Sequence, residues 1–245
     1  MNSAGNDPTD KKPSPVRLER RQELEQHLKD KPADRDGYLE LATIYRRDER
    51  PLDAMRVLKQ ATKIFSDDEK LIWELEEATL ERSVQQFRGV KEVADRLQTP
   101  DALRELERSK SDWAGRRMEV CRARLRRNPK QVHLHFTLAE ALMDAGMYEG
   151  ALEELDESVR HDQLSGRAHF TRGKCLLALN KEIEAMKSLR ACALRRAVVA
   201  PLQTRISALL LLVQIAERLK LDLTLQQYRK QLNALQQEAN TLQKS

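Results

Sequence analysis

Apolar residues recur at spacings of three and four along most of the chain, which is the period of an amphipathic α-helix. The clearest stretches begin near Tyr38, His135 and His169, and in each of them a short break divides two helical runs. In the second run a small residue precedes a large one by four positions, so the helices can approach closely and the large side chain can fill the gap. Each stretch therefore predicts a hairpin of two short helices.

The three stretches are copies of one pattern. Its members are Tyr38, Leu41, Ala42, Tyr45, Ala54, Leu58 and Ala61 in the first copy, His135, Leu138, Ala139, Leu142, Ala151, Leu155 and Ser158 in the second, and His169, Gly173, Leu176, Ala185, Leu189 and Cys192 in the third, which starts 34 residues after the second. The pattern resembles the tetratricopeptide repeat, W-x2-L-G-x2-Y, then A-x3-F, then Pro. The resemblance covers 35–68 and 132–199, although the consensus tryptophan and closing proline are absent and Arg172 stands at a leucine position.

The resemblance implies an all-α solenoid of helical hairpins that holds a protein partner without catalysing a reaction. The expected organisation is a disordered polar tail (1–15) and one helical repeat domain (16–245), which contains a lone first helix, three repeats (35–68, 132–165 and 166–199), a central segment (69–131) and a C-terminal capping pair of helices (200–243).

The central segment, 69–131, contains no good copy of the repeat. Two nearly uninterrupted helical runs lie on either side of Thr99-Pro100-Asp101, where Thr99 can cap a helix that has proline at its first position. This arrangement favours a long helical hairpin. Two degenerate repeats, broken at Gly89 and Gly115, are the alternative.

Composition narrows the class of protein. Aromatic residues make up only 4% of the chain against 34% charged residues, which disfavours β-sandwiches and barrels. The net charge of +5 is small for a dedicated nucleic-acid binder. Cys121, Cys175 and Cys192 have no CxxC spacing, so we expect free thiols and a cytoplasmic location. The most apolar stretch, 206–216, is too short to span a membrane, and residues 1–15 do not form a secretory signal.

The sequence offers no constellation of catalytic residues. His133 and His135 are two positions apart, so on a helix they point in different directions and cannot share a metal ion. His135 and His169 occupy the same slot in successive repeats, which indicates packing rather than metal binding. We therefore expect no enzyme activity, no metal site and no cofactor.

A partner-binding groove follows from the resemblance, which implies that the first helix of each repeat lines a concave surface. The groove residues carried over in this way are His133, Phe136, Glu140, Met143, Arg167, Phe170, Lys174 and Leu177, with Leu39, Thr43 and Arg46 at one end and Thr204, Ala208 and Leu211 at the other. Phe136 and Phe170 would form an exposed apolar strip for a protein or peptide, while Glu140, Arg167 and Lys174 would orient it. Alternatively, either ring turns inward against the neighbouring repeat.

Two other functions stay open. Residues 104–130 contain ten Lys or Arg against four Asp or Glu, so this helix could bind nucleic acid or an acidic partner. The last helix carries a seam of apolar residues at spacings of three and four: Leu225, Tyr228, Leu232, Leu235, Ala239 and Leu242. The seam is expected to dock on the preceding helix, 201–219, and a weak homodimer is the alternative.

Overall fold

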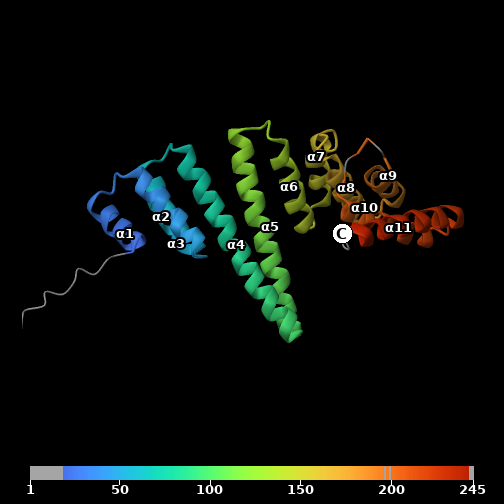
Figure 1. The fold of residues 1–245 in the computed structure, drawn as a ribbon, viewed down its shortest axis with the longest axis horizontal. Coiled ribbons are helices and arrows are strands. Elements are labelled where there is room, and N and C mark those ends of the chain that lie inside the picture. The colour runs from blue at the N-terminus through green and yellow to red at the C-terminus, as the bar shows by residue number, and fades with distance from the viewer. Residues whose placement is uncertain (1–18, 196, 199, 243–245) are drawn as a thin grey trace, which may run out of the picture. The chain divides into compact units, whose positions relative to one another are not determined.

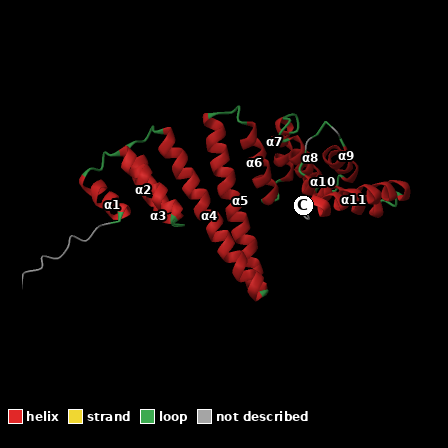
Figure 2. Cartoon of the chain, in the orientation of Figure 1, coloured by secondary structure: helices red, strands yellow, loops and turns green. Residues whose placement is uncertain are grey.

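The computed structural model describes residues 19–195, 197–198 and 200–242, and the predicted tail, 1–15, lies outside these residues. The described residues form helices joined by short links and contain no strand (Figures 1 and 2). The helices are α1 (Arg20–Asp30), α2 (Arg35–Arg47), α3 (Pro51–Ile64), α4 (Glu69–Leu97), α5 (Pro100–Arg127), α6 (Val132–Asp144), α7 (Tyr148–Ser158), α8 (Ser165–Ala178), α9 (Glu182–Leu194), α10 (Leu202–Arg218) and α11 (Asp222–Leu242).

The chain divides into two compact units within α4, the first covering Met1–Arg82 and the second Ser83–Ser245. In the first unit, α1 to α3 and the beginning of α4 share one apolar core, in which Leu58 and Leu71 are fully buried. Arg46 of α2 pairs with Glu74 and Glu81 of α4, and Asp34 caps α2 by accepting a hydrogen bond from the Gly37 N–H at 3.0 Å.

The central segment forms two long helices. α4 has 29 residues and α5 has 28, and neither Gly89 nor Gly115 ends its helix. Thr99 caps α5 as its residue type suggests, because its side chain accepts a hydrogen bond from the Ala102 N–H at 3.3 Å. Two degenerate repeats would require four helices between residues 69 and 131, whereas the structure has these two.

Three helix pairs follow α5 in the second unit: α6 with α7, α8 with α9, and α10 with α11. The large residues that the sequence assigns to the gap within the first two pairs, Leu155 and Leu189, are fully buried. Gly173 lies against Leu189, and Ala139 belongs to the same buried cluster as Leu155, so small residues on the first helix leave room for the leucines of the second.

The same turn closes α2–α3, α6–α7, α8–α9 and α10–α11. A residue with positive φ, namely Glu49 (56°), Gly146 (77°), Asn180 (58°) or Lys220 (55°), ends the first helix of each pair. The N–H of the next residue then donates a hydrogen bond to the carbonyl five positions earlier in the Schellman pattern, for example Lys181 to Leu176 at 2.9 Å. This turn supplies a fixed reference point from which equivalent residues of different pairs can be identified.

Candidate partner-binding face

The eight predicted groove residues occupy equivalent faces of α6 and α8. They lie 13, 10, 6 and 3 positions before the turn residue of their helix, Gly146 or Asn180, so they share one helix face. The two faces adjoin, because Arg167 of α8 contacts both Phe136 and Glu140 of α6. We call this surface the α6–α8 face; it comprises His133, Phe136, Glu140, Met143, Arg167, Phe170, Lys174 and Leu177.

The expected strip of exposed aromatic rings is not present. Phe136 is only 3% exposed and belongs to the same apolar cluster as Cys121 of α5 and Cys175 of α8. Phe170 is half-buried against the core that α9, α10 and α11 form. Met143 and Leu177 are half-buried as well. The prediction of an exposed Phe136 is therefore wrong, and the alternative, in which the ring turns inward, is correct for this residue.

Each ring is covered on its outer side by a cation of the same face. The Arg167 guanidinium lies 4.8 Å from the centre of the Phe136 ring, and the Lys174 ammonium lies 5.6 Å from that of Phe170. Such contacts contribute about 0.5–1 kcal/mol at exposed sites. Arg167 and Lys174 themselves are exposed, so the α6–α8 face presents cations where the sequence suggests apolar rings.

A row of ion pairs connects this face to α5. The Arg117 guanidinium of α5 lies 2.7 Å from Asp144 and 4.0 Å from Glu140, and Glu140 lies 3.3 Å from Arg167. Arg117 also covers the Trp113 ring at 5.5 Å. The sequence alone does not place Arg117 or Trp113 beside the predicted groove. The basic pair Arg116-Arg117 three residues after a tryptophan is the available signal, but the charge pattern predicts a separate basic helix there.

The continuation of the face on α10 differs from the expected residues. Counting back from the turn residue Lys220 gives Ser207, Leu210, Gln214 and Glu217 as the equivalents of the α8 residues. Leu210 is 43% exposed, whereas Ala208 is fully buried and Thr204 and Leu211 are half-buried. The 34-residue spacing fails here because Asn180 and Lys220 are 40 positions apart, with the six extra residues spread over α9, the link and α10.

The residues expected at the other end, Leu39, Thr43 and Arg46, belong to α2 in the first unit. Thr43 is exposed and Leu39 is half-buried. Arg46 is engaged by carboxylates of α4 on its own unit. The α6–α8 face is therefore described from residues of the second unit only.

The C-terminal seam docks within the chain, as its main interpretation predicts. Tyr228 and Leu232 are buried in the core formed with α9 and α10, and Leu225, Leu235 and Ala239 pack partly against it. Leu242, at the end of the seam, remains 64% exposed. Most of the apolar surface proposed for a homodimer is thus covered by α10, and the homodimer stays a prediction.

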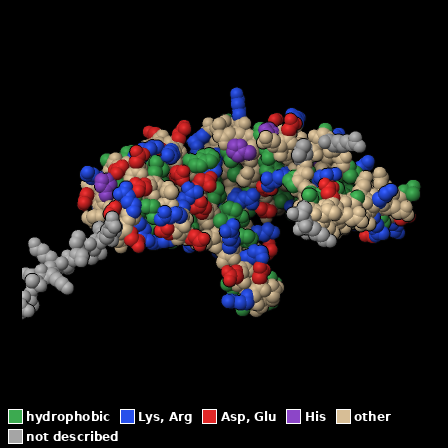
Figure 3. Space-filling model, viewed as in Figure 1, with side chains coloured by type: hydrophobic (Ala, Val, Ile, Leu, Met, Phe, Trp, Pro, Cys, Tyr) green, Lys and Arg blue, Asp and Glu red, His purple; other side chains and the backbone are tan. Residues whose placement is uncertain are grey.

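The basic helix is partly neutralised by neighbouring carboxylates. Arg104 pairs with Asp101, Arg116 pairs with Glu119 at 2.6 Å, and Arg117 pairs with Asp144. Arg124 is buried. On the face shown in Figure 3, the free end of the α4–α5 hairpin displays acidic and basic side chains together. Binding of nucleic acid through residues 104–130 also stays a prediction.

Cys121, Cys175 and Cys192 are buried, and none of them forms a disulfide with a described residue. Burial raises the pKa of the Cys175 and Cys192 thiols to about 11, so both stay protonated near neutral pH and are poor nucleophiles. Among the residues that the structure describes, no group of three or more His, Cys, Asp or Glu could hold a metal ion. No described helix is both long and apolar enough to cross a bilayer.

Comparison with known families gives a match to the tetratricopeptide repeat over residues 113–192, from the second half of α5 into α9. The resemblance to tetratricopeptide repeats is confirmed. The matched range contains both helices of the α6–α8 face. A comparison with curated proteins finds no match.

Solved structures with a similar fold support the same conclusion. A MamA structure, the RS-1 ArsTM double mutant, superposes with a TM-score of 0.56 at 12% identity and covers 85% of this chain and 98% of that chain. YrrB, a TPR protein with an unusual peptide-binding site, superposes with a TM-score of 0.52 at 13% identity, covering 87% of this chain and 92% of that chain. At such identities these likenesses show the fold alone. The all-α solenoid of tetratricopeptide-type hairpins predicted from the sequence is therefore confirmed.

Proposed function

We propose that the protein is a non-catalytic scaffold that binds a partner protein or peptide along the α6–α8 face and its continuation on α10. The observation that carries the proposal is the exposed row of Arg167 and Lys174 on α8 and Leu210 on α10, two neighbouring first helices of the solenoid. Leu210 supplies an apolar anchor of a kind that the buried Phe136 cannot supply. Lys174 has no carboxylate partner among the described residues, so it is available to a partner's acidic group.

The ion pairs of Arg117, Glu140 and Arg167 would set the orientation of the partner. The Arg117 side chain is only 14% exposed and lies close to two carboxylates, those of Asp144 and Glu140. Arg117 therefore restricts the position of the Glu140 side chain. Arg167 is half exposed and bound to Glu140 by one contact, so a partner carboxylate could engage it without disturbing Arg117. Charged groups held in this way contribute mainly to specificity and to the rate of association.

A capture experiment tests the proposal. The wild-type protein is immobilised and exposed to a nuclease-treated lysate beside the double variant Lys174→Glu with Leu210→Glu, and bound proteins are identified by mass spectrometry. The double variant is expected to lose a partner that the wild type retains, because it replaces an exposed cation and an apolar anchor with carboxylates.

The matched control is Lys63→Glu with Ile64→Glu on α3. Ile64 is 44% exposed, close to the 43% of Leu210, and the change in net charge is the same. Circular dichroism first establishes that both variants are folded. Equal capture by wild type and the Lys174 and Leu210 variant would overturn the proposal. Phe136 is unsuitable as a test position, because a buried glutamate there would unfold the repeat.

A further inference from the structure

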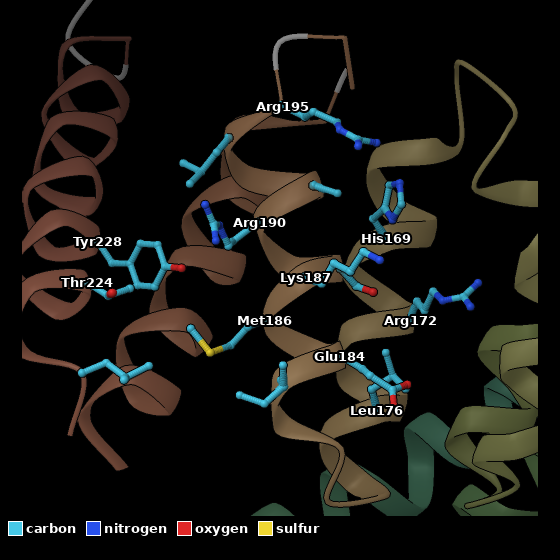
Figure 4. Close-up of a pocket in the computed structure, with 15 residues that line it drawn as sticks. His169, Arg172, Leu176, Glu184, Met186, Lys187, Arg190, Arg195, Thr224 and Tyr228 are labelled. Atoms are coloured by element: carbon cyan, nitrogen blue, oxygen red, sulfur yellow. The ribbon is translucent and has the colours of Figure 1, made fainter. Parts of the chain in front are cut away.

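A cavity of about 1000 Å³ opens on a different side of the second unit, between α8, α9 and α11. Its basic lining comes from Arg172 of α8 and from Lys187, Arg190 and Arg195 on or just beyond α9 (Figure 4). Apolar side chains lie beside them, including Ile183, which is 70% exposed, and Leu221 of the turn before α11. The volume is at the upper end of the range for ligand pockets and exceeds what one small anion would fill.

The cations of this cavity are poorly neutralised. The side chains of Lys187, Arg190 and Arg195 take part in no hydrogen bond or ion pair with the part of the chain that the structure describes, and Arg172 pairs with Asp156 at 2.7 Å. Glu184 is the one carboxylate among the lining residues, all of which are described. Three cations without an ion pair, beside one lining carboxylate, attract an anionic ligand.

Two buried polar atoms in the lining also lack partners. The Tyr228 hydroxyl and the His169 Nδ1 have no hydrogen bond with any described residue, although Tyr228 is only 2% exposed. Figure 4 shows the Tyr228 hydroxyl projecting from α11 towards α9, on the side where Arg190 lies. Buried polar groups are normally satisfied, so an unpaired donor aimed into a basic cavity is available to an acceptor of a ligand.

The preceding repeat shows what is missing. His135 occupies the slot of His169 one repeat earlier, and its Nδ1 lies 2.6 Å from the Glu154 carboxylate of α7. The residue 34 positions after Glu154 is Ser188, whose side chain is too short to take its place. On the same helix face, Glu153 and Asp156 of α7 are replaced by Lys187 and Arg190 of α9. The acidic face of one repeat has therefore become basic in the next, and the carboxylate that satisfies the histidine has been lost.

We infer that this cavity binds an acidic peptide segment whose carboxylate side chain takes, against His169, the place that Glu154 takes against His135. Further carboxylates of the peptide contact Lys187, Arg190 and Arg195, and the Tyr228 hydroxyl donates a hydrogen bond to one of them. An apolar side chain of the peptide covers Ile183 and Leu221. The site is separate from the α6–α8 face, so it goes beyond the scaffold role proposed above.

Fluorescence anisotropy with a defined probe tests this inference. The probe is a fluorescein-labelled octapeptide of alternating glutamate and leucine, and its comparison is the same peptide with glutamine in place of glutamate. The wild type is expected to bind the glutamate peptide, with an affinity that falls as salt is added, and to bind the glutamine peptide at least about tenfold more weakly. Equal binding of both peptides, or no binding of the glutamate peptide at millimolar protein, would overturn the inference.

Two variants locate the binding. Lys187→Glu with Arg190→Glu is expected to weaken binding of the glutamate peptide at least about tenfold, and Tyr228→Phe about threefold, because it removes one hydrogen-bond donor and little volume. The matched control, Lys59→Glu with Lys63→Glu on α3, changes the net charge equally and is expected to bind like the wild type. A Lys187 and Arg190 variant that is folded by circular dichroism and binds normally would overturn the assignment.

Other occupants give distinct results. If inorganic phosphate displaced the labelled peptide as effectively as the unlabelled glutamate peptide does, the site would bind a small anion and the peptide assignment would be overturned. Self-association of the wild type in sedimentation, abolished by Lys187→Glu with Arg190→Glu, would replace the peptide with the acidic α7 of a second copy. The Lys174→Glu and Leu210→Glu variant is expected to bind the glutamate peptide like the wild type. This result would show that the cavity and the α6–α8 face act separately, so that failure of one proposal can be told from failure of the other.

Discussion

The repeats over 132–165 and 166–199 share one backbone pattern but differ in the pairing of their equivalent histidines and in the burial of their equivalent phenylalanines. In the first, His135 is paired with Glu154 and Phe136 is almost fully buried. In the second, His169 has an unpaired Nδ1 and Phe170 is half-buried. Two repeats can therefore have the same helices, turns and gap-filling leucines while one pairs its histidine within the chain and the other leaves its histidine Nδ1 without a partner among the described residues.

The opposite pKa shifts of the two histidines express this difference. For His135, partial burial disfavours the charged ring, but the hydrogen bonds to Glu154 and to the Pro129 carbonyl outweigh it and raise the pKa. For His169, burial and the nearby Arg195 and Arg172 cations all lower the pKa. The same residue type in the same slot is thus stabilised in its charged form in one repeat and in its neutral form in the next.

The largest expected difference between the repeats concerns their phenylalanines. Phe136→Ala is expected to lower the free energy of unfolding by about 3–5 kcal/mol, because it empties a buried site. Phe170→Ala is expected to cost about half as much, because part of that ring already contacts solvent. Urea denaturation followed by circular dichroism measures both values. Equal losses would show that the two rings are equally buried in solution and would contradict the comparison.

A smaller difference is expected at the small residue opposite the gap-filling leucine. A Cβ built on Gly173 would lie 2.6 Å from side-chain atoms of Leu189, which is fully buried and cannot move aside freely, whereas Ala139 already coexists with Leu155. Gly173→Ala is therefore expected to destabilise the protein by about 1 kcal/mol, since overpacking outweighs the gain in helix propensity.

The reverse change in the other repeat is the control for this prediction. Ala139→Gly is expected to lower the free energy of unfolding by about 1 kcal/mol through the weaker helix propensity of glycine. Thermal unfolding of both single variants makes the comparison. A rise in stability for Gly173→Ala would mean that α8 and α9 are packed less closely than α6 and α7.

The smallest expected effect is a pH dependence of opposite sign in the two repeats. Because the pKa of His135 is raised on folding, its contribution to stability is complete below the unfolded pKa of about 6.5 and is lost as pH rises through the folded pKa. Because the pKa of His169 is lowered on folding, its contribution is present above about pH 6.5 and is lost as pH falls through the folded pKa.

Single histidine variants separate the two contributions. Relative to the wild type, His135→Gln should lose stability more steeply when the pH is lowered from neutral, and His169→Gln should lose it less steeply. Denaturant unfolding across this range measures the slopes. Glu154→Gln should lower the pKa of His135 in an NMR titration and leave that of His169 unchanged; a shift of both would show that the histidines are coupled.

The sequence predicted the helical pairs well because their determinants are local. Leu155 and Leu189 are fully buried where the pattern puts them, Thr99 caps α5, and the C-terminal seam docks on α10. Each of these follows from side-chain spacing or capping chemistry within a few turns of one helix. The positions of the eight residues on one pair of adjoining helix faces were also predictable, since the two repeats are 34 residues apart and close with the same turn.

What the sequence did not determine was the exposure and pairing of those residues. Phe136 is buried in a cluster that includes Cys121 of α5, and Arg117 of the same helix engages Glu140, yet no repeat pattern in residues 69–131 indicated that α5 packs there. On α10 the exposed residue is Leu210 and not the expected Ala208, because the spacing between the turn residues Asn180 and Lys220 is six residues longer than the 34-residue repeat.

The amino-acid sequence by itself therefore determined the all-α class, the hairpins and their common turn, because hydrophobic period and cap residues act over short distances along the chain. Only the tertiary structure decided which rings face solvent, which charges are neutralised and where a cavity remains. Burial and ion pairing depend on side chains supplied by a neighbouring helix. In one repeat that helix carries Glu154, which pairs with His135; in the next repeat the equivalent residue is Ser188, and the Nδ1 of His169 has no partner among the described residues.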